Sequence, residues 1–418
     1  MVQSLNSRAF SKAESGWSFF LPIAFLLVQY GYGLGNIMLT YCILFAGYCV
    51  LRYSEFPRFR PLSIYTIWYV LVLLGTVFIF GRSSNLGYWF RLIQILVSGY
   101  CVTIIAKHLD RESLYRYWKV VGLIVCAVVF YQFFQTFFLH QSVLPIRILP
   151  VRSEELMRNE NWTTLSDRPV AFFTEPAMVV AYLVPVLLFA LQKKEWLISV
   201  VVSAAILFSG STSGVIAVSI MWGYSIFSNS YSRSNKILLL FVLLVGILLF
   251  LNLPYFSDSL GKINYELSGD SSNMNVRTQR GWLVYSVLDT QSKLFGISDY
   301  DVSAFIYGTS GAREYTWQVG YEENFYLNTA QRILIQTGLI GAFIYVWMLV
   351  RLWLSTNNTV KPYLAVVIVS MFFASNFYIS GMFVMQFIII LSYLTSFETP
   401  NDALSRRKKL SYYVKKNH

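Results

Sequence analysis

Charged residues are scarce in this sequence: they make up 13% of its 418 residues, about half the share found in soluble domains. Hydrophobic residues account for 56%, and apolar runs such as Ile237 to Leu253 and Leu364 to Phe377 recur along the chain. These runs approach the roughly 20 residues that cross a bilayer as a helix. They lack the short alternating segments of a transmembrane β-barrel, and backbone groups in lipid must pair internally. We therefore predict an all-α polytopic membrane protein.

Cysteine and histidine are rare as well, which removes support for several kinds of site. The four cysteines fall inside apolar runs without the spacing of metal ligands, and the three histidines are isolated from one another. No Walker A, Rossmann or zinc-protease pattern is present. We therefore expect no disulfide framework, no metal site and no cofactor. A histidine-based nucleophile, nucleotide-driven transport and metal-dependent hydrolysis have no support.

The basic residues indicate how the chain is oriented in the membrane. About 12 transmembrane helices are predicted, near residues 17–33, 35–51, 62–81, 86–106, 117–139, 170–191, 195–208, 212–228, 236–253, 325–350, 362–377 and 381–397. If the N-terminus is cytoplasmic, most of the 33 basic residues fall on cytoplasmic segments, and the short outer loops carry only Arg82. Short loops follow the positive-inside rule, so both termini are expected in the cytoplasm. Topology then explains the net charge of +12, which does not indicate nucleic-acid binding.

Two outer segments of this single membrane domain (residues 1–418) are long, at about 140–169 and 254–323. Long loops translocate whatever their charge and commonly carry function. The second loop contains a predicted surface helix from Arg277 to Gln291, on which Arg277 and Arg280 share one face because they are three residues apart. Two guanidinium groups so placed can grip one diphosphate. Gly281 beside them would let a partner segment approach closely.

Other outer arginines, including Arg168 and Arg313, are further candidates for binding phosphate. Arg168 and Glu175 are seven residues apart and share a helix face if the helix continues through Pro169. The alternative is structural: Arg168 and Glu175 form an ion pair, and the other arginines pair with loop carboxylates or lipid headgroups. Arg91, in the outer part of the fourth predicted helix, either snorkels to the interface or is functional.

Glu323 lies where the long outer loop meets the next predicted helix, and a carboxylate at that depth is a candidate general base. A polar stripe follows on one face of this helix, formed by Asn324, Asn328, Gln331, Arg332 and Gln336. Such a stripe must face protein or water. It therefore either lines a functional cavity or only hydrogen-bonds neighbouring helices.

Four segments resemble the Wzy polymerases of O-antigen and capsular polysaccharide, within the O-antigen ligase/polymerase superfamily. They are FFTEPAMVVAYLVP following Arg168, LFSGSTSGVIAV, RTQRGWLVYSVLDTQSKLFGIS and ENFYLNTAQRILIQTGLIGAF. The resemblance covers roughly Arg168 to Val350. It lies in the order of the four segments, in the spacing between them and in their predicted location on the outer side. Superfamily members often have arginine where Thr212 stands. Ligases typically carry histidine where Glu323 stands, so the resemblance favours a polymerase.

The resemblance implies a GT-C-like enzyme of the bacterial inner membrane that works by inverting, metal-independent glycosyl transfer. The donor would be an undecaprenyl-diphosphate-linked glycan and the acceptor a hydroxyl of a second lipid-linked repeat unit. Arg277, Arg280 and Arg168 would stabilise the leaving diphosphate, and Glu323 would accept the hydroxyl proton. Tyr321 would stack on sugars, although an interfacial aromatic belt explains it equally well. A chain-length regulator and a flippase of the same pathway would be partners in the bilayer.

Two other functions stay open. An O-antigen ligase would share the fold, and a flippase for lipid-linked oligosaccharide would also need about a dozen helices and cationic residues. The two halves of the chain show no obvious repeat, and the arginines concentrate in outer loops rather than along helices. Both observations argue against a transporter.

Overall fold

The described part of the chain is helical. The computed structural model describes residues 18–30, 59–79, 86–151, 163–227, 237, 281–298, 302, 305, 327–372, 374 and 381–394. Among them no β-strand forms. Four described helices are long and apolar enough to cross a membrane, namely α3 (Arg60–Ile79), α6 (Arg111–Phe137), α8 (Pro176–Lys193) and α18 (Thr329–Ser355). The prediction of a helical membrane protein is confirmed.

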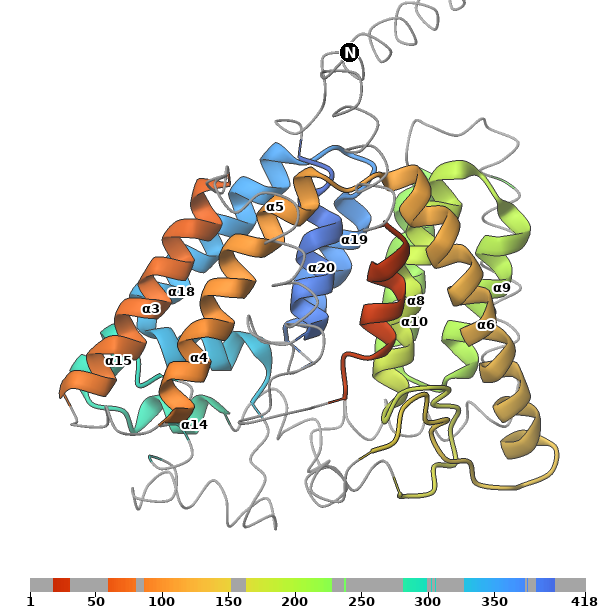
Figure 1. Ribbon diagram of the computed structural model, residues 1–418, viewed down its shortest axis with the longest axis horizontal. Coiled ribbons are helices and arrows are strands. Elements are labelled where there is room, and N and C mark those ends of the chain that lie inside the picture. The colour runs from red at the N-terminus through yellow and green to blue at the C-terminus, as the bar shows by residue number, and fades with distance from the viewer. Residues whose placement is uncertain are drawn as a thin grey trace, which may run out of the picture.

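Shorter apolar helices complete the bundle (Figure 1). They are α4 (Leu86–Leu96), α9 (Trp196–Phe208), α10 (Thr212–Phe227), α19 (Lys361–Ser370) and α20 (Gly381–Leu391). A π-helical turn, η1 (Val97–Cys101), joins α4 to α5 (Val102–Lys107), so that the predicted helix at 86–106 is one continuous rod. The predicted helices at 35–51 and, apart from residue 237, at 236–253 lie outside the described residues.

The segment predicted to be the long outer loop forms two short helices where one helix was expected. Residues 277–291 were expected to be a single surface helix, but α14 (Gly281–Ser286) and α15 (Thr290–Phe295) are separate. Asp289 ends the continuity because its carboxylate accepts a hydrogen bond from the N–H of Ser292 (2.6 Å) and so caps a new helix.

The surface and interior of the bundle suit a lipid environment. Large apolar side chains point outward from several helices, and Phe227 and Phe343 are 86% and 74% exposed. The interior is aromatic: Trp118 stacks on Phe25 and contacts Tyr182, and all three are fully buried. Exposed apolar surface of this kind on several helices marks a face that meets lipid or another apolar partner.

The two ends of the bundle differ in charge. At one end Lys193, at the end of α8, forms an ion pair with Glu112, near the start of α6. Tyr224, near the end of α10, donates to the carbonyl of Asn358 between α18 and α19 (3.0 Å). We call this the basic end, because Lys107, Arg111, Lys193, Lys194, Arg351 and Lys361 lie at these helix termini. The starts of α8, α10 and α18 must then lie at the opposite end, the loop end.

Helix α18 is broken at Gly338, where its backbone meets Gly296 of another segment. Gly338 has a φ of 68° and Gly296, which follows α15, has a φ of 88°. The two residues pack directly against each other: a Cβ on Gly338 would collide with the carbonyl of Leu294, and one on Gly296 with the carbonyl of Gln336. Only glycine combines these backbone angles with so close an approach.

Three carbonyl groups of α18 beside the break accept hydrogen bonds from other segments. The carbonyls of Ile335, Gln336 and Thr337 accept hydrogen bonds from the Ile297 N–H (3.1 Å), the Ser298 N–H (3.2 Å) and the Trp68 indole (2.9 Å), respectively. The turn after α15 and a side chain of α3 thus complete the hydrogen bonding of α18.

Replacing Gly338 by alanine should lower the free energy of unfolding by more than about 2 kcal/mol, because left-handed strain adds to a backbone collision. Gly223→Ala is the matched control: a Cβ there would meet nothing within 4 Å, and alanine is the better helix former. Thermal unfolding in detergent measures both variants. Equal midpoints for the two would show that the break can be accommodated without glycine.

Candidate functional site

Arg168 lies at the loop end, against the turn between α9 and α10. Its guanidinium donates to the carbonyl of Gly210 (3.3 Å), and the side chain is exposed. The hydroxyl of Ser166 accepts from the Arg168 N–H (3.1 Å) and donates to the Arg168 carbonyl (2.8 Å), which fixes the backbone. One of the five guanidinium donors is used on Gly210, so an anion can engage the others.

A buried glutamine of α6 holds the segment that carries Arg168. The amide oxygen of Gln132 accepts from the N–H groups of Val170 (2.9 Å) and Ala171 (2.6 Å), and its amide nitrogen donates to the carbonyl of Leu144 (3.1 Å). Gln132 is 2% exposed. Sequence reasoning missed this residue, although an amide inside an apolar helix was a signal that could have found it.

A second glutamine binds the next part of the same segment. Gln29 donates to the hydroxyl of Thr174 (2.7 Å) and accepts from its N–H (2.8 Å). Glu175 follows as the N-cap residue of α8, with its side chain exposed. Two amides, one on α6 and one in the turn that follows the helix at residues 18–26, therefore hold the stretch from Arg168 to Glu175 in an irregular, non-helical path.

The predicted start of this helix at residue 170 is wrong, because α8 begins at Pro176. Ala171 has a φ of 49°, outside the helical region, and its N–H is taken by Gln132. Arg168 and Glu175 therefore do not share a face of one helix. Both remain at the loop end, Arg168 on the α9–α10 turn and Glu175 at the start of α8.

The α9–α10 turn is tight and polar. The Ser209 hydroxyl donates to the carbonyl of Ile206 (2.7 Å), and the hydroxyls of Ser211 and Ser213 are hydrogen-bonded (2.8 Å). A Cβ on Gly214 would lie 2.9 Å from the side chain of Ile206, so α10 packs closely on α9. Thr212 is the first residue of α10. The starts of α8 and α10 thus flank Arg168, and helix N-termini favour negative charge.

The start of α18 is held by a network of amides. Asn328 and Gln331 form a capping box, in which the Asn328 side chain accepts from the Gln331 N–H (2.9 Å) and the Gln331 side chain from the Asn328 N–H (3.2 Å). Asn328 also donates to the carbonyl of Phe372 (3.0 Å). This part of the predicted polar stripe therefore makes hydrogen bonds within the protein, and Arg332 donates to the carbonyl of Leu327 (3.3 Å).

Gly281, at the start of α14, packs directly on the side chain of Gln331, and a Cβ there would collide with the Gln331 amide. The prediction that Gly281 permits a close approach is confirmed. The contact joins two segments that carry predicted chemistry: Arg280 is bonded to Gly281, and Glu323 and Asn324 precede Asn328 by a few residues. Predicted site residues that lie outside the described part of the chain are Arg277, Arg280, Arg313, Tyr321, Glu323 and Asn324.

Arg91 is half-buried on α4 and donates to Gln94 one turn further along (3.0 Å). Helix α4 packs on α3, away from the α9–α10 turn that holds Arg168 (Figure 1). The structure therefore brings Arg168 and Glu175 to one part of the loop end and leaves Arg91 in another.

Comparison with known families finds a match, which includes part of the loop end. Residues 197–346 match the family model Wzy_C, described as O-antigen ligase. Residues 197–346 thus carry a domain of the O-antigen ligase/polymerase superfamily. No curated protein matches the chain.

The superfamily match covers the parts of the loop end that the structure ties together. It runs from α9 through the α9–α10 turn, α14 and α15, and past the break in α18. Arg168 and Glu175 precede the match, and Arg168 contacts it through the Gly210 carbonyl. Members of this superfamily are enzymes that act on polysaccharides.

Arg168→Lys should keep the protein folded and reduce surface polysaccharide by about tenfold, because lysine keeps the charge but loses the bidentate fork. Arg147→Lys, at an exposed arginine of the same loop, is the matched control and should be tolerated. Gel analysis of surface glycan at equal protein levels measures both. A normal amount of surface glycan in Arg168→Lys would mean that Arg168 only holds the α9–α10 turn in place.

Proposed function

We propose that this protein polymerises undecaprenyl-diphosphate-linked repeat units into O-antigen or capsular polysaccharide at the periplasmic face of a bacterial inner membrane. The observation that carries the proposal is the contact of Gly281 with Gln331. It fixes the segment that follows Arg280 against the helix that follows Glu323. We propose that a cation for a leaving diphosphate and a base for a hydroxyl, carried by the residues that precede these two segments, act together.

The reaction proposed is a direct displacement at the anomeric carbon of the donor glycan. The acceptor hydroxyl oxygen forms a bond to that carbon with inversion, and the bond from the carbon to the diphosphate oxygen breaks. Glu323 takes the hydroxyl proton, while Arg277, Arg280 and Arg168 stabilise the charge that develops on the departing diphosphate. Arg313, Asn324, Tyr321, Glu175 and Arg91 are proposed to contribute to substrate binding.

The proposed topology places the basic end in the cytoplasm and the loop end outside. Its support is the accumulation of lysine and arginine at the termini of α5, α6, α8, α18 and α19, which follows the positive-inside rule. About 12 spans with both termini inside complete this arrangement, and residues 140–169 and 254–323 are the two outer loops. Lipid-linked substrate would then enter from the outer leaflet.

A ligase is the second candidate, because the description of the matching family model is O-antigen ligase. The transfer chemistry would be the same, with a hydroxyl of the lipid A core as acceptor. Glu323, at the place where the resembling ligases carry histidine, favours the polymerase. Deleting the gene in a strain with a complete pathway separates the candidates on a gel. One repeat unit per core indicates a lost polymerase, accumulated long lipid-linked chains a lost ligase, and trapped inner-leaflet precursor a lost flippase.

Complementing that deletion with Glu323→Gln should give no polymer, because the amide is nearly isosteric but cannot accept the proton, a loss of about 10² to 10⁴ in rate. Glu322→Gln is the matched control and should restore polymer, since it makes the same change at the neighbouring carboxylate, to which the proposal gives no role. Immunoblots verify equal membrane levels. Polymer from Glu323→Gln would remove the general base from the proposal.

A further inference from the structure

Helices α14 and α15, at the loop end, expose several apolar side chains. Each is between 36% and 47% exposed, and together they comprise Trp282, Leu283, Val287, Leu294 and Phe295. The other side of the helix pair is packed on protein, because Val284 and Leu288 form a buried cluster with Leu327 and Ile335. The two helices therefore have one face against the α18 segment and one apolar face that the described residues leave open.

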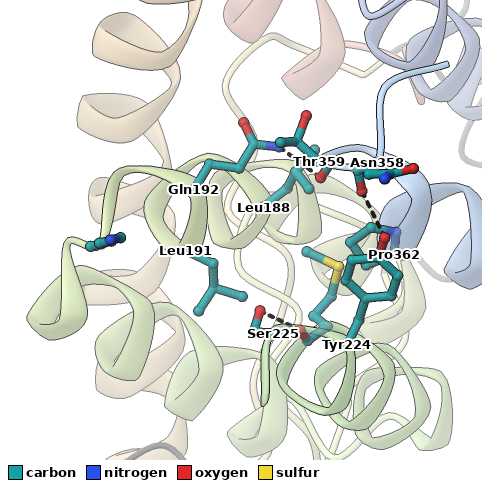
Figure 2. Close-up of a pocket in the computed structure, with 10 residues that line it drawn as sticks. Leu188, Leu191, Gln192, Tyr224, Ser225, Asn358, Thr359 and Pro362 are labelled. Carbon is teal, nitrogen blue, oxygen red and sulfur yellow. Dashed lines mark hydrogen bonds between the residues drawn. The ribbon is translucent and has the colours of Figure 1, made fainter. Parts of the chain in front are cut away.

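Comparable side chains at the basic end are covered by protein. There the turn between α18 and α19 is fixed across α8 by the amide of Gln192, which donates to the carbonyl of Thr359 (2.9 Å). Beside this turn Leu188 and Leu191 are buried and line a pocket of about 210 Å³ (Figure 2). A short connection between helices can thus cover apolar side chains, so the open face of α14 and α15 needs another explanation.

The contact of Phe295 with α3 gives the depth of α15 in the bundle. Phe295 stacks on Trp68, with 6.2 Å between the ring centroids. Trp68 lies ten residues before Phe78, at which the apolar span of α3 ends. Ten residues of helix extend about 15 Å, half of the roughly 30 Å of hydrocarbon in a bilayer. Figure 1 shows that α3 ends at the loop end and that α14 lies nearer to that end than α15. Phe295 is therefore well inside the span of α3.

The side chains of α15 are arranged in a way that suits this depth. The helix has a polar start, with Asp289 as its cap, whereas its last two residues are the apolar Leu294 and Phe295. The ammonium group of Lys293 donates to the carbonyl of Ser286, at the end of α14 (2.7 Å). A charged side chain near a membrane interface is directed toward the headgroups in this manner.

The backbone that follows α15 is also compatible with hydrocarbon. The Gly296 N–H donates to the carbonyl of Ser292 (2.8 Å), and the N–H groups of Ile297 and Ser298 donate to carbonyls of α18. Irregular backbone is tolerated at membrane depth only where protein or water supplies its hydrogen bonds. Because α18 accepts these hydrogen bonds, the turn can lie below the headgroups.

We propose that α14 and α15 form a re-entrant element, which enters the leaflet at the loop end and contacts its acyl chains through Leu294 and Phe295. Trp282, on α14, lies at the headgroups, where tryptophan is enriched. Lipid is the favoured occupant because α3 exposes Ile67 and Leu71 at a similar depth, and one apolar solvent suits both surfaces. The inference requires membrane residence but neither the proposed orientation nor the proposed glycan chemistry.

Fluorescence quenching of the full-length protein in liposomes tests this element, after the four cysteines of the chain are changed to alanine. A bimane label on Leu294→Cys should be quenched by lipids that carry a doxyl group deep in the acyl chain. Iodide should quench it at least about tenfold less than a label on Gln141→Cys, an exposed position after α6, because ions enter hydrocarbon poorly. Leu71→Cys, on α3, is the matched control for a lipid-facing position. A label on Leu283→Cys, on α14, should respond more to a doxyl group near the headgroups.

Three results would overturn the proposal. Iodide quenching at Leu294→Cys as strong as at Gln141→Cys would place α15 in water. Protection from both quenchers would mean that protein covers the face: a second copy if dilution into excess lipid removes the protection, and another part of this chain if it does not. Loss of doxyl quenching at Leu294→Cys but not at Leu71→Cys, on addition of undecaprenyl diphosphate, would identify the prenyl chain of that molecule as the occupant.

Discussion

Three carbonyl groups of α18 beside the break at Gly338 accept hydrogen bonds from other segments, and these bonds tie the turn after α15 to the helix. An unsatisfied carbonyl away from water costs several kcal/mol, so a break inside a membrane helix persists only where its groups are paired. Ile297 and Ser298 supply two donors, and the indole of Trp68 supplies the third. Because Gly296 and Gly338 allow the backbones to touch, the turn after α15 becomes part of the membrane bundle.

Buried amides extend the same principle to the rest of the loop end. Gln29 and Gln132 bind backbone groups of the irregular segment from Val170 to Thr174, and Gln331 binds the backbone N–H of Asn328, the cap residue of its own helix. Side-chain amides inside a membrane protein need hydrogen-bond partners. Here the partners are backbone groups, and the hydrogen bonds hold the loops in position. Arg168 can therefore be exposed to a ligand and still have a defined backbone. The outer chemistry proposed for this protein rests on a scaffold of uncharged polar contacts.

Much of the helical framework could be predicted from hydropathy, because apolar runs in lipid have helix as their default. The helices predicted at 195–208 and 212–228 lie within a residue of α9 and α10. The start of α8 could not be predicted, since the N–H of Ala171 is captured by Gln132, far away in sequence. The break at Gly338 was hidden for a similar reason: its cause is the approach of Gly296, and the apolar pattern continues through it.

The residues of the candidate site also differ in how far the sequence could predict them. Local sequence signals pointed to Arg168 and to the close approach at Gly281. The cap at Asp289, which splits the predicted surface helix, also has a local sequence signal, but it was not used. Gln29 and Gln132 act through contacts that only the fold creates. The roles of Glu323, Arg277 and Arg280 remain predictions on residues outside the described part of the chain.

The most direct measurement is reconstitution of the purified protein alone in liposomes with undecaprenyl-diphosphate-linked repeat units and no added nucleotide or divalent metal. The account predicts a ladder of lipid-linked products with increasing numbers of repeats and release of undecaprenyl diphosphate. Absence of the ladder, together with transfer of the glycan when lipid A core is supplied, would contradict polymerisation and identify a ligase.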